Sequence, residues 1–264
     1  MHYRLREGVH ILRSTVDPMN APSFLAGRTV ILTRTAEDAS GWARHLERSG
    51  AHTVVLPCIE VDVFRDARTA ARLGAALEEA RWLLLASPRG VEAVAGLVGS
   101  VPACVKIAVV GPATARRAEE VLAPPSLIAP GGNAHSMGES LAERLGSQIT
   151  TVAAAVARGG RTDAVDILRR RGHTVTTVEV YATRPHPPKD PPDDLRHLDR
   201  PLIFLASPSA ARGLVQRARL PPTAQVITIG PTTTAAAREL GLAVAAEATG
   251  RSLEDLVAAA ARTR

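Results

Sequence analysis

The sequence has few of the residues that usually hold metals or form disulfides. Its 264 residues include only two cysteines, Cys58 and Cys104, and these form no CxxC pair. The eight histidines show no HxH, HxxxH or HExxH spacing. Ligands for zinc and similar metals usually recur at such short spacings, so we expect no metal site. Two isolated thiols are instead typical of a protein of the reducing cytosol.

Long apolar segments are also missing. The longest uninterrupted apolar run has six residues, whereas a helix that spans a bilayer needs about 20. The N-terminal stretch MHYRLREGVHILRSTVDPMN interrupts every apolar run with charge, so it does not read as a signal peptide. We therefore expect a cytoplasmic protein with no membrane partner.

Lysine and aromatic residues are scarce, whereas arginine is abundant. Lys106 and Lys189 are the only lysines among 32 basic residues, aromatic residues make up 3% of the chain, and the net charge is +6. Arginine binds carboxylates through its planar fork, and positive charge favours an anionic partner. A GC-rich coding sequence would produce the same composition. Because the basic residues are scattered and no nucleic-acid-binding motif is present, we expect no nucleic-acid partner.

The chain contains an internal repeat. Residues 83–94 (LLLASPRGVEAV) and 203–214 (IFLASPSAARGL) correspond at an offset of 120. The Gly-Pro dipeptides that begin at Gly111 and Gly230 correspond at an offset of 119. Two unrelated coincidences would not keep nearly the same offset. A period of this length indicates two similar domains rather than a solenoid.

The pattern along the chain alternates β-rich runs with segments of helical periodicity. Apolar runs bounded by turn residues are typical of buried parallel strands, and the intervening periodic segments are typical of crossover helices. The fold class predicted is therefore α/β with two doubly wound parallel sheets. The expected strands are 29–34, 52–57, 82–86, 106–110, 126–130, 202–206 and 226–229, and the expected helices are 36–49, 67–80, 89–98, 113–122 and 253–262.

Two segments lack this alternation. Residues 1–26 show no sustained periodicity, and we expect them to form a loose N-terminal extension. Residues 184–194 (RPHPPKDPPDD) are rich in proline, which forbids helix and favours an extended, semi-rigid linker.

Four strand-to-helix turns carry the repeat. Two are Ala-Ser-Pro, in which the serine is a good helix N-cap and the proline suits the first helical position. Two are Gly-Pro-x-Thr, in which glycine allows close approach of the backbone. Capping alone explains any one of these turns. Together they place several anion-binding helix N-termini at the carboxyl ends of parallel strands, where ligands bind. No nucleotide-binding fingerprint accompanies them.

A few side chains are candidates for catalysis or substrate binding. Tyr181 is one of two tyrosines and is expected to end the strand before the proline-rich linker, where its phenol could move a proton. A packing role is an equal alternative. Arg34 and Arg158 occupy equivalent strand ends, and Arg89 follows an Ala-Ser-Pro turn. Each could bind a carboxylate, although a solvated arginine is the simpler interpretation.

The order of these features resembles the uroporphyrinogen-III synthase family. The Ser-Pro and Gly-Pro-x-Thr turns occur in the same order twice, with an Arg-Gly turn and a VxxVEVYxT segment between them. The Gly132-Asn133-Ala134 turn and the closing LEDL helix also match, and the resemblance covers residues 27–262.

The resemblance implies a particular architecture. Two flavodoxin-like domains would be joined by a two-stranded hinge, with the active site in the cleft between them. Domain 1 would be discontinuous, residues 27–58 plus 186–264, and domain 2 would comprise residues 61–177. The hinge strands would be 58–62 and 178–185. Residues 1–26 would form an N-terminal extension outside both domains.

The reaction implied is closure of linear hydroxymethylbilane to uroporphyrinogen III, with inversion of ring D, loss of water and no metal or organic cofactor. We expect a monomer, since nothing in the sequence demands an oligomer. Tyr181 would assist the leaving hydroxyl. Side chains and backbone of the turns would bind the substrate carboxylates, with these residues as candidates: Arg34, Ser87, Arg89, Gly111, Thr114, Asn133, Arg158, Gly159, Ser207, Ser209, Gly230 and Thr233.

One departure from the family pattern leaves a second interpretation open. The family often has Phe-Thr-Ser at the serine turns, whereas this chain has Leu-Ala-Ser at 85–87 and 205–207. Two hydroxyl donors are therefore absent. The alternative is a non-catalytic paralogue of the same fold that senses a tetrapyrrole or another anion.

Overall fold

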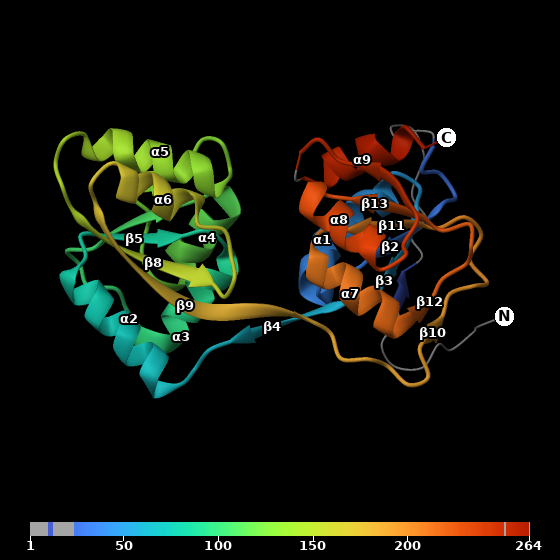
Figure 1. The fold of residues 1–264 in the computed structure, drawn as a ribbon, viewed down its shortest axis with the longest axis horizontal. Helices are drawn as coiled ribbons and strands as arrows, with labels where there is room; N and C mark the ends of the chain where they lie inside the picture. The colour runs from blue at the N-terminus through green and yellow to red at the C-terminus, as the bar shows by residue number, and fades with distance from the viewer. Residues whose placement is uncertain (1–9, 13–23, 251, 264) are drawn as a thin grey trace. The chain divides into compact units, whose positions relative to one another are not determined.

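The computed structural model describes residues 10–12, 24–250 and 252–263. The chain divides into two compact units (Figure 1). Unit 1 consists of Met1–Glu60 with Arg184–Arg264, and unit 2 is the continuous segment Val61–Thr183. Each unit is built on a six-stranded sheet.

The sheet of unit 1 is parallel except at one edge. Its order is β1-β3-β2-β11-β13-β14, and only β1 runs antiparallel to its neighbour. β10 (Asp193–Asp194), at the end of the proline-rich segment, forms a separate small parallel pair with β12 (Ala218–Arg219). The strands are β1 (His10–Leu12), β2 (Thr29–Leu32), β3 (His52–Val55), β11 (Leu202–Leu205), β13 (Gln225–Thr228) and β14 (Val244–Glu247).

Successive residues of a strand point to opposite faces, so a central parallel strand such as β2 supplies both cores of unit 1. Val30 and Leu32 pack with helices α1 (Ala36–Arg48) and α9 (Leu253–Ala261) on one face. Ile31, between them, packs with α7 (Pro208–Arg217) on the other face, which α8 (Pro231–Glu239) also covers. This double burial is why the strands read as continuous apolar runs.

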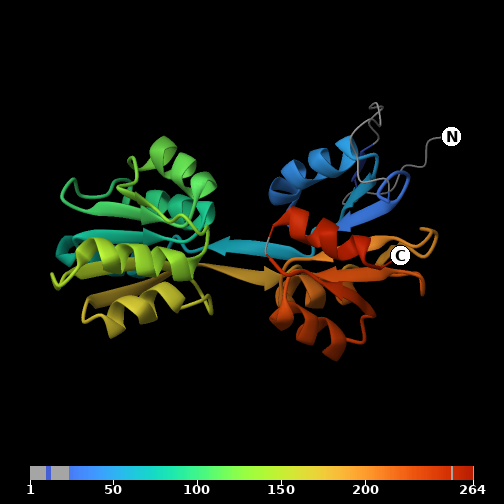
Figure 2. The same ribbon diagram turned by 90° about the horizontal axis from the view of Figure 1, so that it is seen from above.

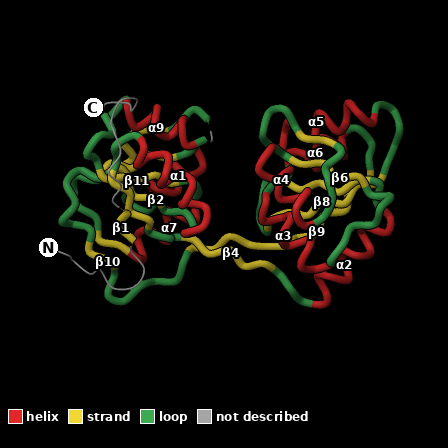
Figure 3. Tube along the Cα trace, turned by 180° about the vertical axis from the view of Figure 1, so that it is seen from behind, coloured by secondary structure: helices red, strands yellow, loops and turns green. Residues whose placement is uncertain are grey.

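Unit 2 has the same construction. Its sheet has the order β4-β9-β8-β5-β6-β7. Helices α2, α3 and α4 cover one face, and α5 and α6 cover the other (Figure 1), while Figure 3 shows the strands in yellow between the red helices. The strands are β4 (Ile59–Val63), β5 (Trp82–Leu85), β6 (Lys106–Val109), β7 (Leu127–Ile128), β8 (Thr151–Ala157) and β9 (Thr174–Pro185); the helices are α2 (Ala67–Glu79), α3 (Pro88–Val98), α4 (Pro112–Val121), α5 (Ala134–Leu145) and α6 (Asp163–Arg170).

Two strands carry the chain from one unit to the other. Phe64 N–H donates to the Val180 carbonyl (3.0 Å), and His186 N–H donates to the Cys58 carbonyl (2.8 Å). As the chain advances from Cys58 to Phe64, its hydrogen-bond partners run back from His186 to Val180. The strands β4 and β9 are therefore antiparallel, as the opposed arrows in Figure 2 show.

The repeat explains the topology. In unit 1 the five parallel strands lie in the order 2-1-3-4-5 when numbered along the chain, which is the flavodoxin-like order. The parallel strands of unit 2 lie in the same order when β8 is counted as the first strand. The segment β8-α6-β9, which comes last in unit 2, therefore occupies the place that β2-α1-β3, which comes first, has in unit 1. Each unit therefore combines the first part of one repeat copy with the second part of the other.

The expected α/β fold class with parallel sheets is confirmed, but the expectation of a loose extension at 1–26 is wrong in two places. His10–Leu12 pairs with β3, and Leu25 is 1% exposed in the core beneath α1 and α9. Three residues are too few to show the two-residue periodicity of a strand, so this edge strand could not be predicted from the sequence. The remaining residues of 1–23 lie outside the described part of the chain. Within the described residues, no helix has the length and apolar character that crossing a bilayer would require.

Candidate functional site

The carboxyl ends of β5 and β8 form the polar edge of unit 2. These strands are neighbours, and the strand order reverses between them, which is the position where open parallel sheets bind ligands. Ser87 follows β5 and begins α3, while Arg158 and Gly159 follow β8 directly. The sheet topology therefore brings together three candidate residues that are far apart in sequence.

Tyr181 joins this group through its phenol. The Tyr181 Oη and Ser87 Oγ atoms are 3.0 Å apart, and either can be the donor. Ser87 Oγ also accepts the Gly90 N–H at 3.1 Å, which caps the N-terminus of α3. The phenol ring packs against the core beneath α3 and is partly buried. The proposed proton donor thus has a fixed hydroxyl partner at a helix N-terminus.

A β-bulge aims Tyr181 at Ser87. Val156 pairs with Glu179, but the next residue, Ala157, pairs with Tyr181, so Val180 is an extra residue in β9. In a regular strand Val180 and Tyr181 would face opposite sides of the sheet. The bulge instead leaves both packed against the core on the α3 side. The expectation that the strand ends at Tyr181 is wrong, because β9 continues to Pro185.

Arg158 is held beside this edge by two contacts. Its Nε donates to Glu179 Oε2 at 2.9 Å, and its guanidinium carbon lies 4.5 Å from the centre of the Phe64 ring. The side chain remains 57% exposed. A cation over a ring and beside a carboxylate is positioned while its other N–H groups stay available to a ligand. Gly159 follows with φ of +63°, a conformation that favours glycine.

Unit 1 carries the equivalent edge between β2 and β11. Ser207 Oγ accepts the Ala210 N–H at 3.1 Å and caps α7, as Ser87 caps α3. Arg34 pairs with Asp38 at 3.6 Å and stacks over the Trp42 ring at 4.3 Å. Both repeat copies therefore place an arginine with one carboxylate and one aromatic ring at this edge.

The two edges differ in one chemical respect. At the repeat offset of the arginines, the residue that corresponds to Tyr181 is Pro57. Unit 1 therefore has the capping serine and the arginine but no phenol at this position. Thr33, at the end of β2, is fully buried and donates its hydroxyl to the Phe204 carbonyl at 2.8 Å. Within the described part of the chain, a serine–tyrosine hydroxyl pair therefore occurs at this edge in unit 2 and not in unit 1.

The Gly-Pro-x-Thr turns begin α4 and α8. No described side chain caps either helix at Gly111 or Gly230, in contrast to the serine-capped helices. The first residue of each helix is a proline without an N–H, and in α8 the Thr233 N–H donates to the Gly230 carbonyl at 3.1 Å, so only part of each first turn is open to an anion. Thr114 and Thr233 are 3% and 2% exposed, so a ligand at these turns would contact their neighbours rather than the threonines themselves.

The remaining candidates lie at helix N-termini. Asn133 caps α5 by accepting the Ser136 N–H at 2.9 Å, and its amide donates to the Gly131 carbonyl at 2.9 Å. Arg89 and Ser209 lie in the first turns of α3 and α7 and are half-buried. Among the described residues, no three His, Cys, Asp or Glu side chains converge as a metal site.

Sequence reasoning missed the partners that position these side chains. Glu179 and Phe64 hold Arg158, and Trp42 holds Arg34, yet none was singled out. The signal for Trp42 was available, since it lies one helical turn beyond Asp38 on α1. The bulge at Val180 could not be predicted, because the sequence around it alternates as in a regular strand.

Fold and site together define a class: a two-unit α/β protein with flavodoxin-like sheets and strand-to-helix turns that begin helices at the carboxyl edges of the sheets. The family model of uroporphyrinogen-III synthase HemD matches residues 40–258. The uroporphyrinogen-III synthase of Synechococcus elongatus is 30% identical over an alignment that covers 89% of this chain and 95% of the relative.

Solved structures of uroporphyrinogen-III synthases share the fold. The Helicobacter pylori structure has a TM-score of 0.58 at 16% identity and covers 90% of this chain and 100% of its own. A mutant Thermus thermophilus structure has a TM-score of 0.51 at 16% identity, with 90% and 98% covered. The chain belongs to the uroporphyrinogen-III synthase family, hydro-lyases of tetrapyrrole biosynthesis. The comparisons give no support to the non-catalytic alternative.

Proposed function

We propose that this chain closes hydroxymethylbilane to uroporphyrinogen III, with inversion of ring D and loss of water. The observation that carries the proposal is the Ser87–Tyr181 hydroxyl pair at the reversal of strand order in unit 2. Family membership supplies the reaction class, and the pair supplies a group that can act on a leaving hydroxyl.

Tyr181 acts as the proton donor in this proposal. The Gly90 N–H occupies one lone pair of Ser87 Oγ, and Ser87 can in turn donate its own proton to Tyr181 Oη. The phenol proton is then directed to the substrate. Each hydrogen bond in such a chain polarises the next. A donor positioned in this way contributes typically about 10²–10⁴-fold to a rate.

The chemistry balances without a co-reactant. The bond between the terminal carbon and its hydroxyl oxygen breaks, and the oxygen leaves as water with the proton from Tyr181. The resulting azafulvene cation is attacked by the substituted carbon of ring D, which gives a spiro intermediate. The bond from that ring D carbon to the bridging carbon of ring C then breaks, and the bridging carbon bonds to the unsubstituted carbon of ring D, which loses one proton and so restores Tyr181. The net change is loss of one water.

Substrate positioning is the larger task, because uncatalysed closure gives the wrong isomer. The substrate carries eight carboxylates, and each unit offers amides and arginines suited to them. In unit 2 these are the N-termini at Gly111 and Asn133 with Arg158, and in unit 1 the N-termini at Ser207 and Gly230 with Arg34. Holding a flexible chain in one reactive conformation converts binding energy into rate.

One assay tests the proposal. Hydroxymethylbilane is generated in place, incubated with the protein, and the uroporphyrin isomers are separated after oxidation. We expect isomer III to dominate. Formation of isomer I alone, at the rate seen without protein, would refute the assignment.

We also propose that the protein works in the cytoplasm as a monomer, without metal or organic cofactor. The two isolated cysteines support the cytoplasm, and the lack of metal-ligand spacings supports a reaction without a metal. Light scattering on the purified chain tests the monomer, and unchanged isomer III formation in excess chelator tests metal independence.

A further inference from the structure

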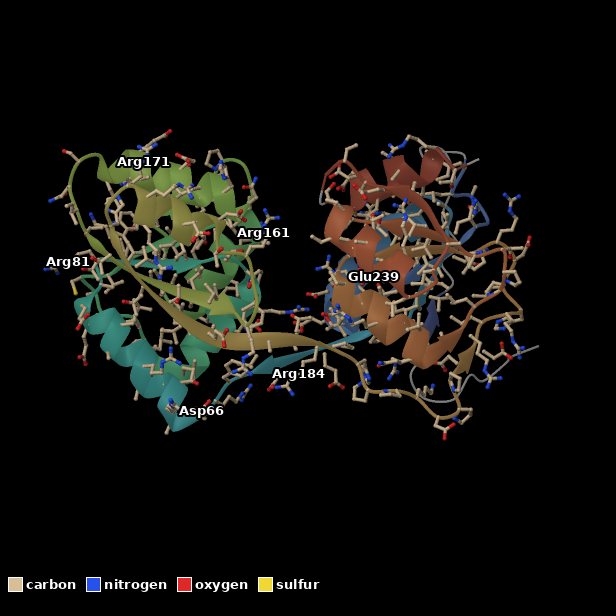
Figure 4. The ribbon with its side chains drawn as sticks, viewed as in Figure 1. Asp66, Arg81, Arg161, Arg171, Arg184 and Glu239 are labelled. Carbon is tan, nitrogen blue, oxygen red and sulfur yellow. The ribbon has the colours of Figure 1, made fainter. Side chains whose placement is uncertain are left out.

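A basic pocket lies at the edge of unit 2 opposite Tyr181. It has a volume of about 310 Å³ and is lined by Arg81, Lys106 and Arg144 together with Trp82, Cys104 and Gln148. Trp82 and Lys106 are the first residues of β5 and β6 and face each other in register. Figure 4 shows Arg81 at one side of unit 2 and Arg161, beyond the end of β8, at the other. Ser87 is five residues beyond Trp82, which is about 16 Å along an extended strand.

The three cations converge without a carboxylate. Lys106 Nζ and the Arg144 guanidinium lie 5.7 and 5.9 Å from the centre of the Trp82 ring, which holds both near the same pocket. No acidic residue lines the pocket, and no described carboxylate pairs with Arg81, Lys106 or Arg144. Like charges around a concave site repel one another and concentrate the field for an anion.

Neither the fold nor the proposed reaction accounts for this arrangement. The Trp82 ring is 4% exposed and packs with α5 and α6, so packing alone would be served by neutral neighbours. The pocket lies near the lower limit of ligand sites, which span about 300–1,000 Å³. Such a volume suits a small metabolite rather than a linear tetrapyrrole.

We propose that this pocket binds a small molecule carrying two or more carboxylate or phosphate groups. Arg81, Lys106 and Arg144 bind the anionic groups, and Gln148 offers an amide for an additional polar group. The site is separate from the proposed catalytic edge, so the proposal does not depend on the synthase reaction.

Cys104 is a built-in reporter for the test. It lines the pocket and is exposed, whereas Cys58 is buried, and burial raises the pKa of the Cys58 thiol to about 12. Because the thiolate is the reactive form, Cys104 is the thiol that a reagent modifies near neutral pH. Iodoacetamide is neutral, so its reaction is not itself steered by the pocket. A bound anion is expected to slow alkylation by covering the thiol.

The experiment measures the alkylation rate of the full chain while citrate or pyrophosphate is added at constant ionic strength. We expect a saturable decrease in rate with at least one of them, and the two probes distinguish carboxylate from phosphate ligands. In K106Q/R144Q the apparent Kd should rise by about tenfold or more for each cation removed. The control R72Q/R170Q removes the same charge at exposed positions and should keep the wild-type Kd.

A second measurement removes dependence on the thiol. In W42F, Trp82 is the remaining tryptophan, and its fluorescence should follow the same binding curve. No saturable response to citrate or pyrophosphate, or an equal loss of binding in K106Q/R144Q and R72Q/R170Q, would overturn the proposal. Either result would leave the isomer assay unaffected.

Discussion

At the scale of single residues, the position of Tyr181 depends on one extra residue in β9. The bulge at Val180 turns the phenol to the α3 side, where the capping serine lies. The corresponding serine in unit 1, Ser207, caps α7 but has no phenol partner among the described residues. The duplicated chain thus provides its own control for separating a capping role from a catalytic one.

We expect Tyr181→Phe to lower kcat for isomer III formation by about 10²-fold or more, because it removes the proposed proton donor. The ring still fills its place in the core, so the free energy of unfolding should change little. Rapid-quench or steady-state assay of isomer III, with urea unfolding in parallel, measures both. An unchanged kcat would remove Tyr181 from the mechanism.

Ser87→Ala and Ser207→Ala form a matched pair. Each removes a helix N-cap, so each should lower the free energy of unfolding by about 1 kcal/mol. Only Ser87→Ala also removes the partner of the phenol, so it should lower kcat, whereas Ser207→Ala should act mainly on KM. Equal effects of the two changes on kcat would show that the Ser87–Tyr181 bond has no special role.

The buried thiol of Cys58 makes stability depend on pH. Burial is the main reason that its pKa rises from an ordinary 9.0 to about 12. The folded state therefore favours the neutral thiol. Stability is unaffected below about pH 9 and falls as pH rises from there toward 12, with a limiting slope of about 1.4 kcal/mol per pH unit.

Urea unfolding between pH 8 and 10.5 tests this, with Cys58→Ala as the comparison. The variant loses some packing at every pH, but its stability should fall less steeply above pH 9 than that of the parent chain. Parallel curves for the two proteins would contradict the prediction.

At the scale of elements, the crossing strand β4 is held on unit 1 by a close contact with α7. A Cβ added to Gly213 would lie 1.8 Å from the Cys58 carbonyl oxygen, just before β4 begins. The backbone of Cys58, which directly precedes β4, therefore packs directly against the backbone of α7 at Gly213. At the repeat offset of the serine turns, α3 carries Ala93 in the corresponding position. This glycine therefore marks where the two repeat copies differ in packing.

We expect Gly213→Ala to lower the free energy of unfolding by about 1–3 kcal/mol or more, since neither helix nor strand backbone can yield easily. The control is Gly96→Ala in α3, where an added Cβ meets nothing within 4 Å. That change should raise stability by roughly 0.5–1 kcal/mol through helix propensity. Thermal and urea unfolding of both variants measure the difference. Stabilisation by both changes would show that the strand is free to move away from α7.

The elements were largely predictable and their contacts were not. Two strands, Trp82–Leu85 and Leu202–Leu205, are buried on both faces, so their continuous apolar sequences predict strands correctly. The serine turns and the Gly-Pro turns likewise predict where helices begin. By contrast, the bond from Ser87 to Tyr181 spans 94 residues and depends on a bulge that no periodicity reveals. The basic pocket also assembles residues from three separate strand and helix ends, and its members look like ordinary surface cations in the sequence.

At the scale of the whole molecule, the two repeat copies are interleaved. β2 pairs with β11 from the second copy, and β5 pairs with β8, which also belongs to the second copy. A cut between the copies would therefore remove a central strand neighbour from both sheets. The units differ in continuity: unit 2 is one segment with two cores of its own, whereas unit 1 needs both ends of the chain.

This difference leads to a prediction about fragments. Residues 59–185, which include both crossing strands, should fold alone, because every strand of the unit 2 sheet and both of its covering helix layers are present. Residues 1–148 contain the first repeat copy but leave β2 without β11 and β5 without β8. They should not give a cooperative transition, since the missing neighbours expose the centres of both sheets. Urea unfolding by circular dichroism and amide NMR dispersion compare the two fragments. Cooperative folding of 1–148 together with failure of 59–185 would mean that the sequence repeat, rather than the compact unit, is the folding unit.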